Sequence, residues 1–280
     1  IDEQVIPGLK MYHDTTRTPH GYSSYITADK SDRFYDDNIW LVIDLVDLYN
    51  LTAKQSYLDM ALDIWNFVLS GRDTVLGDGI YWCEQTKDTK NTCSNAPAAV
   101  AALKLHKATG EQQYFDQGEN FYTWVFYSLR DKDHLYWDNV SVKGKFDKRK
   151  FSYNSGQMIE AGALLYEITG NKEYLQQAQA TASASLSQWT KVYSNDDEES
   201  LYIVESGDVW FDAVLLRGYL ALWRADGQDV YLSAYDDTLS YAWYMGRDEN
   251  GLFGKYLTHR QENETKSWLL TQAAYVEMAA

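Results

Sequence analysis

The chain is organised by a motif that recurs four times at nearly constant spacing. Each copy starts at a leucine, and the starting residues Leu48, Leu105, Leu165 and Leu222 are 57, 60 and 57 residues apart. The copies read LYNLTAKQSYL, LHKATGEQQYF, LYEITGNKEYL and LWRADGQDVYL. Such regular spacing predicts a fold built of stacked supersecondary units.

Each copy of the motif is predicted to be the turn of a helical hairpin. An almost wholly apolar helix precedes it, expected over 39–49, 96–106, 156–166 and 212–223. The turn usually contains Gly, which adopts the positive φ that closes the last turn of a helix. A second helix then begins near a repeated tyrosine, and its apolar residues recur every three or four positions. The first helix of each pair is therefore expected to be an inner helix and the second an outer one.

The two ends of the chain extend the same pattern. Residues 1–12 match the end of an outer helix, and residues 268–280 match an inner helix without its outer partner. This makes five inner and five outer helices, whereas a closed ring of six hairpins needs twelve. The sequence thus predicts an all-α (α/α)6 toroid, or barrel, as one domain over residues 1–280, with one leading helix pair absent. An open α-solenoid that serves as a binding scaffold is the alternative.

Composition narrows the range of partners. The chain has 41 acidic and 25 basic residues, a net charge of −16, which disfavours nucleic acid and anionic membrane surfaces. It has no apolar run long enough for a transmembrane helix, so no membrane span is expected. Twenty-three Tyr and ten Trp suit surfaces that stack on sugars or other flat, hydroxyl-rich ligands, although such residues also fill helix seams.

Metal and redox chemistry receive little support from the sequence. The five histidines are scattered without a zinc-binding motif, and Cys83 and Cys93 have no histidine at metal-ligand spacing. We therefore predict no metal and no cofactor. The two cysteines either form one disulfide or stay as packed thiols, and packed thiols are favoured. We expect a monomer, and a secreted or cell-surface location is favoured over a cytoplasmic one.

The repeat predicts where polar side chains gather, because the residues just before the inner helices must surround one mouth of the ring. These residues are rich in Asn, Asp, Tyr and Trp, which together are typical of a sugar-binding surface. They lie at 35–38, 90–95, 153–155, 210–212 and Trp268, with loops 77–85, 135–139 and 248–255 at the same end. Asn, Ser and Asp are also ordinary helix N-caps, and capping is the simpler explanation for Asn95, Ser155 and Asp212.

Asp36 and Asp37 are explained less well by capping, because one cap needs only one side chain. They stand in the string RFYDDNIW, among Phe34, Tyr35 and Trp40. Such surroundings desolvate at least one carboxylate and move the two pKa values apart, which acid/base chemistry requires. The pair is therefore predicted to be catalytic.

Seven strings then point to a known family: YDDNIW, GDGIYWCEQ, KNTCSNAPAA, YWDN, YNSGQMI, VLLRGYL and WLLTQAAYVEMA. The chain resembles glycoside hydrolase family 76, the α-1,6-mannanase family, over nearly its whole length. The resemblance implies an (α/α)6 barrel and a retaining mechanism, with Asp36 as nucleophile and Asp37 as general acid/base. The residues then expected to orient the pair or to bind substrate are Tyr35, Asn38, Trp82, Asn91, Asn95, Trp137, Asp138, Tyr153, Asn154, Gln157 and Trp210.

The predicted function is endo-α-1,6-mannanase-like hydrolysis of an α-linked mannose oligo- or polysaccharide. One alternative is a transglycosylase that passes the glycosyl-enzyme to a sugar acceptor, which product analysis with added mannosyl acceptors distinguishes. Another is a non-catalytic carbohydrate-binding toroid, which predicts no activity to lose when Asp36 and Asp37 are replaced. The choice of the α-1,6 linkage rests on the resemblance alone.

Overall fold

A computed structural model describes residues 1–26, 31–194, 200–259 and 266–280. The chain divides into two compact units, Ile1–Arg130 with Tyr136–Arg149, and Asp131–Leu135 with Lys150–Ala280. They are called the N-terminal unit and the C-terminal unit below. One domain over residues 1–280 stays a prediction. Among the described residues, none of the helices combines the length and the apolarity that a bilayer crossing needs.

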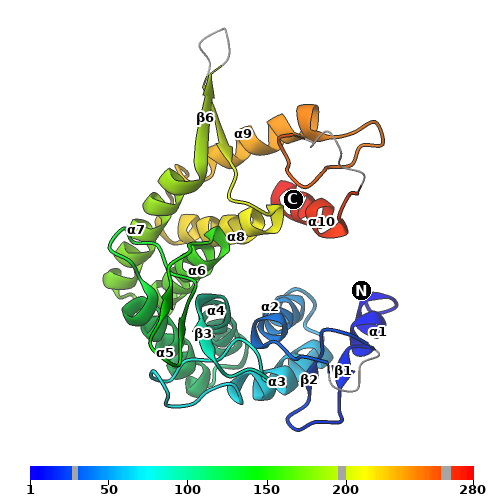
Figure 1. The fold of residues 1–280 in the computed structure, drawn as a ribbon, viewed down its shortest axis with the longest axis vertical. Coiled ribbons are helices and arrows are strands. Elements are labelled where there is room, and N and C mark those ends of the chain that lie inside the picture. The colour runs from blue at the N-terminus through cyan, green and yellow to red at the C-terminus, as the bar shows by residue number, and fades with distance from the viewer. Residues whose placement is uncertain (27–30, 195–199, 260–265) are drawn as a thin grey trace. The chain divides into compact units, whose positions relative to one another are not determined.

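The N-terminal unit consists of a short helix and two helical hairpins (Figure 1). Its helices are α1 (Val5–Lys10), α2 (Tyr35–Thr52), α3 (Gln55–Leu69), α4 (Thr92–Thr109) and α5 (Gln112–Leu129). The helix α2 packs against α3 and α4, and α4 packs against α5. The predicted pairing of inner and outer helices is confirmed in this unit.

The C-terminal unit continues the pattern with two further hairpins and a final helix. Its helices are α6 (Ser152–Thr169), α7 (Lys172–Trp189), α8 (Val209–Asp226), α9 (Ser233–Tyr241), the π-helical turn η1 (Ala242–Gly246) and α10 (Leu269–Ala279). The helix α6 packs against α7 and α8, and α8 packs against α10. Over the described residues, the predicted five inner and five outer helices are all present.

The four hairpins close with the same backbone conformation, as the repeated motif predicts. The last turn of each inner helix is capped by a residue in the left-handed region, whose N–H donates to the carbonyl four residues earlier; these residues are Ala53, Gly110, Gly170 and Gly227. Three of them are glycines, which adopt this conformation readily. Ala53, at φ 55°, carries a Cβ in a conformation that disfavours it.

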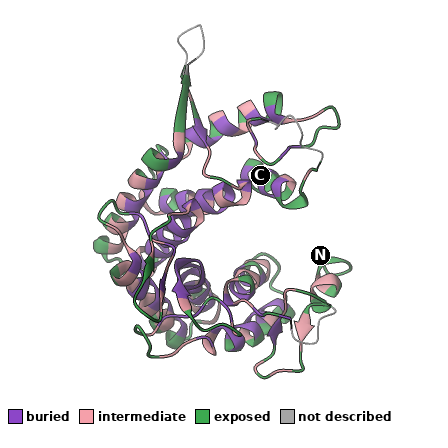
Figure 2. Cartoon of the chain, in the orientation of Figure 1, coloured by how far each residue is buried: buried purple, intermediate pink, exposed green. Residues whose placement is uncertain are grey.

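The inner helices α4 and α6 are buried far more completely than the outer helices α5 and α7 that follow them (Figure 2). Residues 92–103 of α4 and 154–165 of α6 are buried without interruption, whereas α5 and α7 alternate between buried and exposed positions. This matches the nearly apolar composition of the inner helices. Polar groups in their first turns are consequently held within the protein, where an unpaired group is costly.

Short antiparallel strands lie in the long loops between hairpins. The pair β1 (His13–Asp14) and β2 (Gly21–Tyr22) precedes α2, and β3 (Thr89–Asn91), β4 (Asn139–Ser141) and β5 (Phe146–Asp147) form one small sheet. In the C-terminal unit β6 (Thr190–Ser194) pairs with β7 (Ser200–Val204). The sheet β3–β4–β5 brings the loop after α5 against the start of α4.

Glycines let α6 and α8 approach each other closely. A Cβ placed on Gly218 would stand 2.3 Å from the carbonyl oxygen of Gly156, and one on Gly156 would stand 2.6 Å from that of Val214. Atoms at such distances overlap, and both neighbours are backbone atoms that cannot turn aside. The contact between α6 and α8 is therefore made by their backbones.

Candidate active site

The fourth residue of α2 is an amide that fixes the strand in front of the helix. The side-chain nitrogen of Asn38 donates to the carbonyl oxygens of Tyr22, at 3.0 Å, and Phe34, at 2.8 Å. Its side-chain oxygen accepts from the N–H of Tyr22 at 2.7 Å. We call this pattern an amide clamp, because one side chain satisfies both backbone groups of a loop residue and one carbonyl of its own helix.

Two further inner helices carry an amide clamp at the same position. In α4 the clamp joins Asn95 to Ile80 and Asn91, and in α10 it joins Gln272 to Phe253 and Trp268. The clamps of α2 and α4 leave no amide group available to a ligand, since Asn38 and Asn95 are fully buried. Tyr35 is also fully buried, with its ring stacked on Phe67 at 4.9 Å. In this structure the three residues hold the backbone around the site, which agrees with the orienting role expected of Tyr35 and Asn38, and the sugar contacts expected of the three stay predictions.

The Asp36 carboxyl, in the first turn of α2, is partly buried. Its Oδ2 accepts a hydrogen bond from Nε1 of Trp82 at 3.0 Å, while its buried Oδ1 has no hydrogen-bond partner among the described residues. Burial, followed by the charge of Asp37, raises the pKa of Asp36 to about 7, although hydrogen bonds from Trp82 and Cys93 oppose the shift. A carboxyl group with this pKa can hold or release a proton near neutral pH.

Asp37 differs from its neighbour because its side chain is exposed. Desolvation by the surrounding protein raises the pKa of Asp37 as well, but solvent reaches the carboxylate and limits the effect. The pair thus combines one enclosed carboxyl group and one open one. Such a difference in surroundings is the arrangement by which two carboxyl groups take different roles in one reaction.

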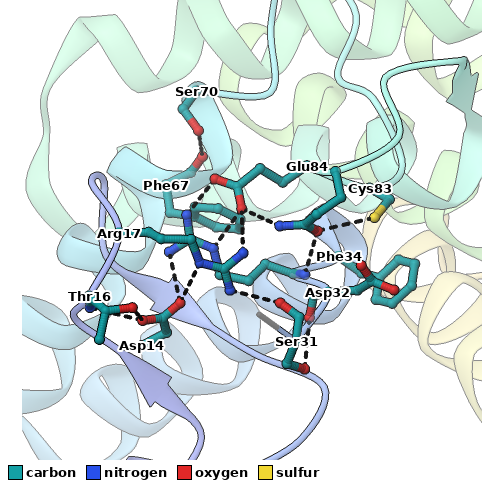
Figure 3. Close-up of polar contacts among 12 residues, drawn as sticks. Asp14, Thr16, Arg17, Ser31, Asp32, Phe34, Phe67, Ser70, Cys83 and Glu84 are labelled. Atoms are coloured by element: carbon teal, nitrogen blue, oxygen red, sulfur yellow. Dashed lines mark hydrogen bonds and ion pairs between the residues drawn. The ribbon is translucent and has the colours of Figure 1, made fainter. Parts of the chain in front are cut away.

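A buried ion pair fixes the loop that carries Trp82 (Figure 3). Arg33 is fully buried, and its guanidinium binds both carboxylate oxygens of Glu84, with Nε at 2.8 Å from Oε2. Burial acts to raise the pKa of Glu84, but the hydrogen bonds and charge of Arg33 outweigh it, so the pKa lies below its ordinary value.

Backbone hydrogen bonds connect this ion pair to the start of α2, which holds the acid pair. The N–H of Glu84 donates to the carbonyl of Arg33, and the N–H of Tyr35 donates to the carbonyl of Trp82 at 2.9 Å. The rings of Phe34 and Trp82 also lie 4.7 Å apart. Arg33 and Glu84 are therefore positioning residues for Asp36, and the sequence analysis did not recognise this role for them.

The start of α4 adds polar groups to the same unit. Asp138 is buried, which raises its pKa, and it accepts from Asn139 at 3.0 Å. The backbone N–H of Thr92 donates to the carbonyl of Asp138 at 2.8 Å. Neither Oδ1 of buried Asn91 nor Nε1 of Trp137 has a hydrogen-bond partner among the described residues. Buried donors and acceptors of this kind need a partner such as water or a ligand hydroxyl group.

The predicted site residues of the C-terminal unit gather at the start of α6 and α8. The ring of Tyr153 lies 5.0 Å from that of Trp210 and 4.6 Å from that of Phe211. The amide of Asn154 and Oε1 of Gln157 are buried without a hydrogen-bond partner among the described residues. A cavity of about 390 Å³ adjoins them, lined by Asp208, Val209, Trp210, Lys255, Lys266, Trp268, Leu270 and Thr271. Convergence of the residues of both units on one mouth stays a prediction.

A second buried acid lies in the C-terminal unit. Asp212 is the fourth residue of α8, and burial raises its pKa to about 7, against the effect of the Ser206 hydrogen bond. The hydroxyl of Ser206 donates to Asp212 and also lies 2.5 Å from the hydroxyl of Ser152. Asp212 therefore links its own loop to the start of α6, which is more than the helix cap expected from the sequence.

The two cysteines are free thiols and both are buried. This confirms the favoured prediction of packed thiols. Cys93 has a further effect that its sequence position did not reveal, since its thiol acts to lower the pKa of Asp36 in part.

A family model for glycosyl hydrolase family 76 matches residues 5–269 of the chain. The chain belongs to this family. Among solved structures, it is similar to the family 76 mannosidase Bt3792 from Bacteroides thetaiotaomicron, with 33% identity and a TM-score of 0.92, over 99% of this chain and 77% of that one. This likeness confirms the all-α fold of the (α/α)6 class.

Relatives with named activities are more distant. The α-1,6-mannanase GH76A of Salegentibacter sp. HEL1_6 is 26% identical, with a TM-score of 0.75, over 88% of this chain and 74% of that one. An inactive variant of that enzyme, with two consecutive aspartates replaced, has been solved with α-1,6-mannotriose. Mannan endo-1,6-alpha-mannosidase DCW1 of Candida glabrata is 29% identical over 47% of this chain. The chain spans 40% or less of the length of the curated relatives it matches.

Proposed function

We propose that this protein is a glycosidase that hydrolyses α-1,6-linked mannosides with retention of configuration, using Asp36 and Asp37. The substrate class is supported by the relatives, which include an α-1,6-mannanase and a mannan endo-1,6-alpha-mannosidase. Replacement of two consecutive aspartates in the inactive variant of the Salegentibacter enzyme supports the choice of the pair.

The observation that carries the proposal is the difference between the two carboxyl groups. Asp36 is enclosed, is oriented by the indole of Trp82 and has one oxygen without a protein partner, whereas Asp37 is open to solvent. A retaining glycosidase needs one carboxylate to attack the anomeric carbon and one carboxylic acid to protonate the leaving oxygen and then activate water.

The roles follow from which group reaches the departing sugar and the incoming water. Asp37, which is exposed, is suited to protonate the leaving oxygen and later to take a proton from water. Asp36, which is held in one orientation by Trp82, is suited to form the glycosyl-enzyme bond. Before attack, Asp36 must be deprotonated and Asp37 must carry the proton. Because the pKa of Asp36 is raised to about 7, the bound sugar must move the proton from Asp36 to Asp37.

The roles can be tested by replacing each carboxyl group with an amide. In Asp37→Asn, a mannoside with a good leaving group should still form the glycosyl-enzyme, because it needs no acid, while α-1,6-mannan should be cleaved at least about 10³-fold more slowly. Added azide should then rescue turnover and give the α-mannosyl azide. Asp36→Asn should be inactive on both substrates, and Asp59→Asn, an exposed acid on α3, serves as the control.

Each other outcome has a defined meaning. If azide gives the α-mannosyl azide with Asp36→Asn and not with Asp37→Asn, the two roles are reversed, whereas β-mannosyl azide from Asp36→Asn agrees with the loss of the nucleophile. If both variants cleave mannan as the wild type does, the pair is not catalytic. Transfer to an added mannosyl acceptor in place of hydrolysis would identify a transglycosylase.

A further inference from the structure

Three side chains with metal-ligating atoms meet on the N-terminal unit, away from the residues described above. They are His13 on β1, His20 just before β2, and Asp63 on α3. One ligating atom from each lies within 4.8 Å of the other two, and Nε2 of His13 is 3.8 Å from Oδ2 of Asp63. The histidines are seven residues apart and Asp63 is more distant, so no sequence motif marks the group.

The fold holds this group through the β1–β2 ribbon. His13 pairs with Tyr22 in the ribbon, and their rings stack at 4.9 Å, while the ring of His20 meets His13 edge-on at 5.9 Å. Tyr22 is in turn fixed by the amide clamp of Asn38. Because α3 packs against β2, Asp63 is presented to the histidines by a rigid helix.

The chemistry of the three groups is that of a zinc site. Two imidazole nitrogens and one carboxylate oxygen bind Zn²⁺ at about 2.1 Å, which sets ligand atoms about 3.4 Å apart in a tetrahedral site. The closest pair, at 3.8 Å, is near this value, and a small side-chain rotation brings in the third. His20 and Asp63 are exposed, so water can supply a fourth ligand and an ion can enter.

Other charges nearby do not compete for these ligands. Arg17 bonds to Asp14 at 2.6 Å and lies within 3.5 Å of Glu84, and Arg33 binds Glu84. Arg17 and Arg33 are thus engaged with acids other than Asp63, and Lys10 is the basic side chain whose charge acts on His13. The net charge of −16 also attracts cations to the protein.

We propose that His13, His20 and Asp63 form a Zn²⁺-binding site that fastens the β1–β2 ribbon to α3. The site replaces the expectation from sequence that the chain holds no metal. It is independent of the proposed glycosidase activity, because none of its ligands belongs to the acid pair. Its effect is to stabilise the β1–β2 ribbon, which the side chain of Asn38 also binds through the backbone of Tyr22.

The test is Zn²⁺ binding to the whole chain after treatment with a chelator. Titration calorimetry should show one Zn²⁺ per chain, and Co²⁺ should give the visible bands of a tetrahedral complex. In His20→Ala and Asp63→Asn, which alter exposed side chains, affinity for Zn²⁺ should fall at least about tenfold. His259→Ala, an exposed histidine of the C-terminal unit, should bind as the wild type does.

A second measurement separates specific from adventitious binding. At one Zn²⁺ concentration just above the dissociation constant of the wild type, the melting temperature of the wild type and of His259→Ala should rise, and those of His20→Ala and Asp63→Asn should rise much less. Equal Zn²⁺ affinity in all four proteins would overturn the proposal, as would the absence of stoichiometric binding to the wild type.

Discussion

The starts of α2 and α8 each hold an aspartate whose pKa is raised to about 7, yet the two acids differ in what their neighbours do. In α2 the acid is the second residue, Asp36, and the fourth residue, Asn38, clamps the preceding strand. In α8 the fourth residue is itself the acid, Asp212, and it is bound by Ser206. In α2 an amide therefore binds the preceding loop and the acid is not needed for this contact, whereas in α8 the acid itself makes it.

The same contrast extends to the other inner helices. Amide clamps occur in α2, α4 and α10, whereas α6 has Ser155 at the fourth position, with its hydroxyl unpaired among the described residues. The helices without a clamp, α6 and α8, are joined through the close approach of Gly156 and Gly218. Side-chain amides thus hold the loops before α2, α4 and α10, whereas α6 and α8 contact each other through their backbones.

The largest expected effect comes from replacing Asp36 by Asn, and the same replacement at Asp212 is the comparison. Asp36→Asn should lower kcat on α-1,6-mannan by about 10³-fold or more, because a reacting group is lost. Asp212→Asn should stay within about threefold of the wild type, since an amide keeps the shape of the side chain and can accept the Ser206 hydrogen bond. Steady-state kinetics on folded proteins would measure both, and comparable losses would remove the distinction between the two acids.

The pH profile of the wild type should show the same acid pair. A pKa raised to about 7 means that the pair holds a proton below that pH and loses it above, so kcat/KM should fall as pH rises through about 7. Asp212 has a similar pKa, and Asp212→Asn should therefore leave this alkaline limb in place. If the alkaline limb disappears in Asp212→Asn, the limb belongs to Asp212 on α8 and not to the acid pair on α2.

Breaking a clamp should cost more stability than removing the residue at the same position of α6. Asn38→Ala leaves both backbone groups of Tyr22 and the carbonyl of Phe34 without their partner, at a cost of about 3 kcal/mol in the free energy of unfolding. Ser155→Ala removes a buried hydroxyl that bonds to no described group, and we expect a change within about 0.5 kcal/mol. Denaturant titration would compare them, and equal losses would contradict the clamp.

The helix contact in the C-terminal unit can be broken separately. Gly218→Ala places a methyl group against the backbone of Gly156, so the free energy of unfolding should fall by about 2 kcal/mol. Gly8→Ala is the control, because a Cβ there meets nothing within 4 Å. If Gly218→Ala unfolds at the denaturant concentration of the wild type, the two helices are not held at this point.

The smallest expected effect is an increase in the free energy of unfolding. Ala53→Gly relieves the one non-glycine residue among the four hairpin caps and should stabilise the protein by up to about 1 kcal/mol. The reverse change in a matching turn, Gly170→Ala, should destabilise by a similar amount. A loss of stability in Ala53→Gly would show that the cap conformation is set by something other than φ.

Much of this architecture follows from the sequence because the hairpin turns repeat. The motif that begins at Leu165 places the end of α6 and the start of α7, since Thr169, Gly170 and Asn171 act within the turn itself. The role of Asn95 could not be read in this way. Its partner Ile80 lies fifteen residues earlier in an irregular loop, and the same amide looks like a helix cap or a sugar ligand until that loop is placed.

The sequence predicted where the candidate site lies, but not the surroundings of its residues. The position of Asp36 and Asp37 at a helix start followed from the repeat, but the enclosure of one and exposure of the other depend on Trp82, which is brought in by the Arg33–Glu84 ion pair. The group of His13, His20 and Asp63 gave no signal at all, because its members join only when a two-residue ribbon packs on α3.

The amide clamp also bears on how such a chain can diversify. Each clamp holds a single loop residue, such as Ile80, next to its helix, and the stretch between that residue and the helix carries the site. Insertions before Ile80 in the sequence, for example between residues 72 and 79, leave the position of Trp82 relative to Asp36 unchanged. Loop length and site geometry can therefore evolve separately, and new binding segments can be grafted beside the acids without refitting them.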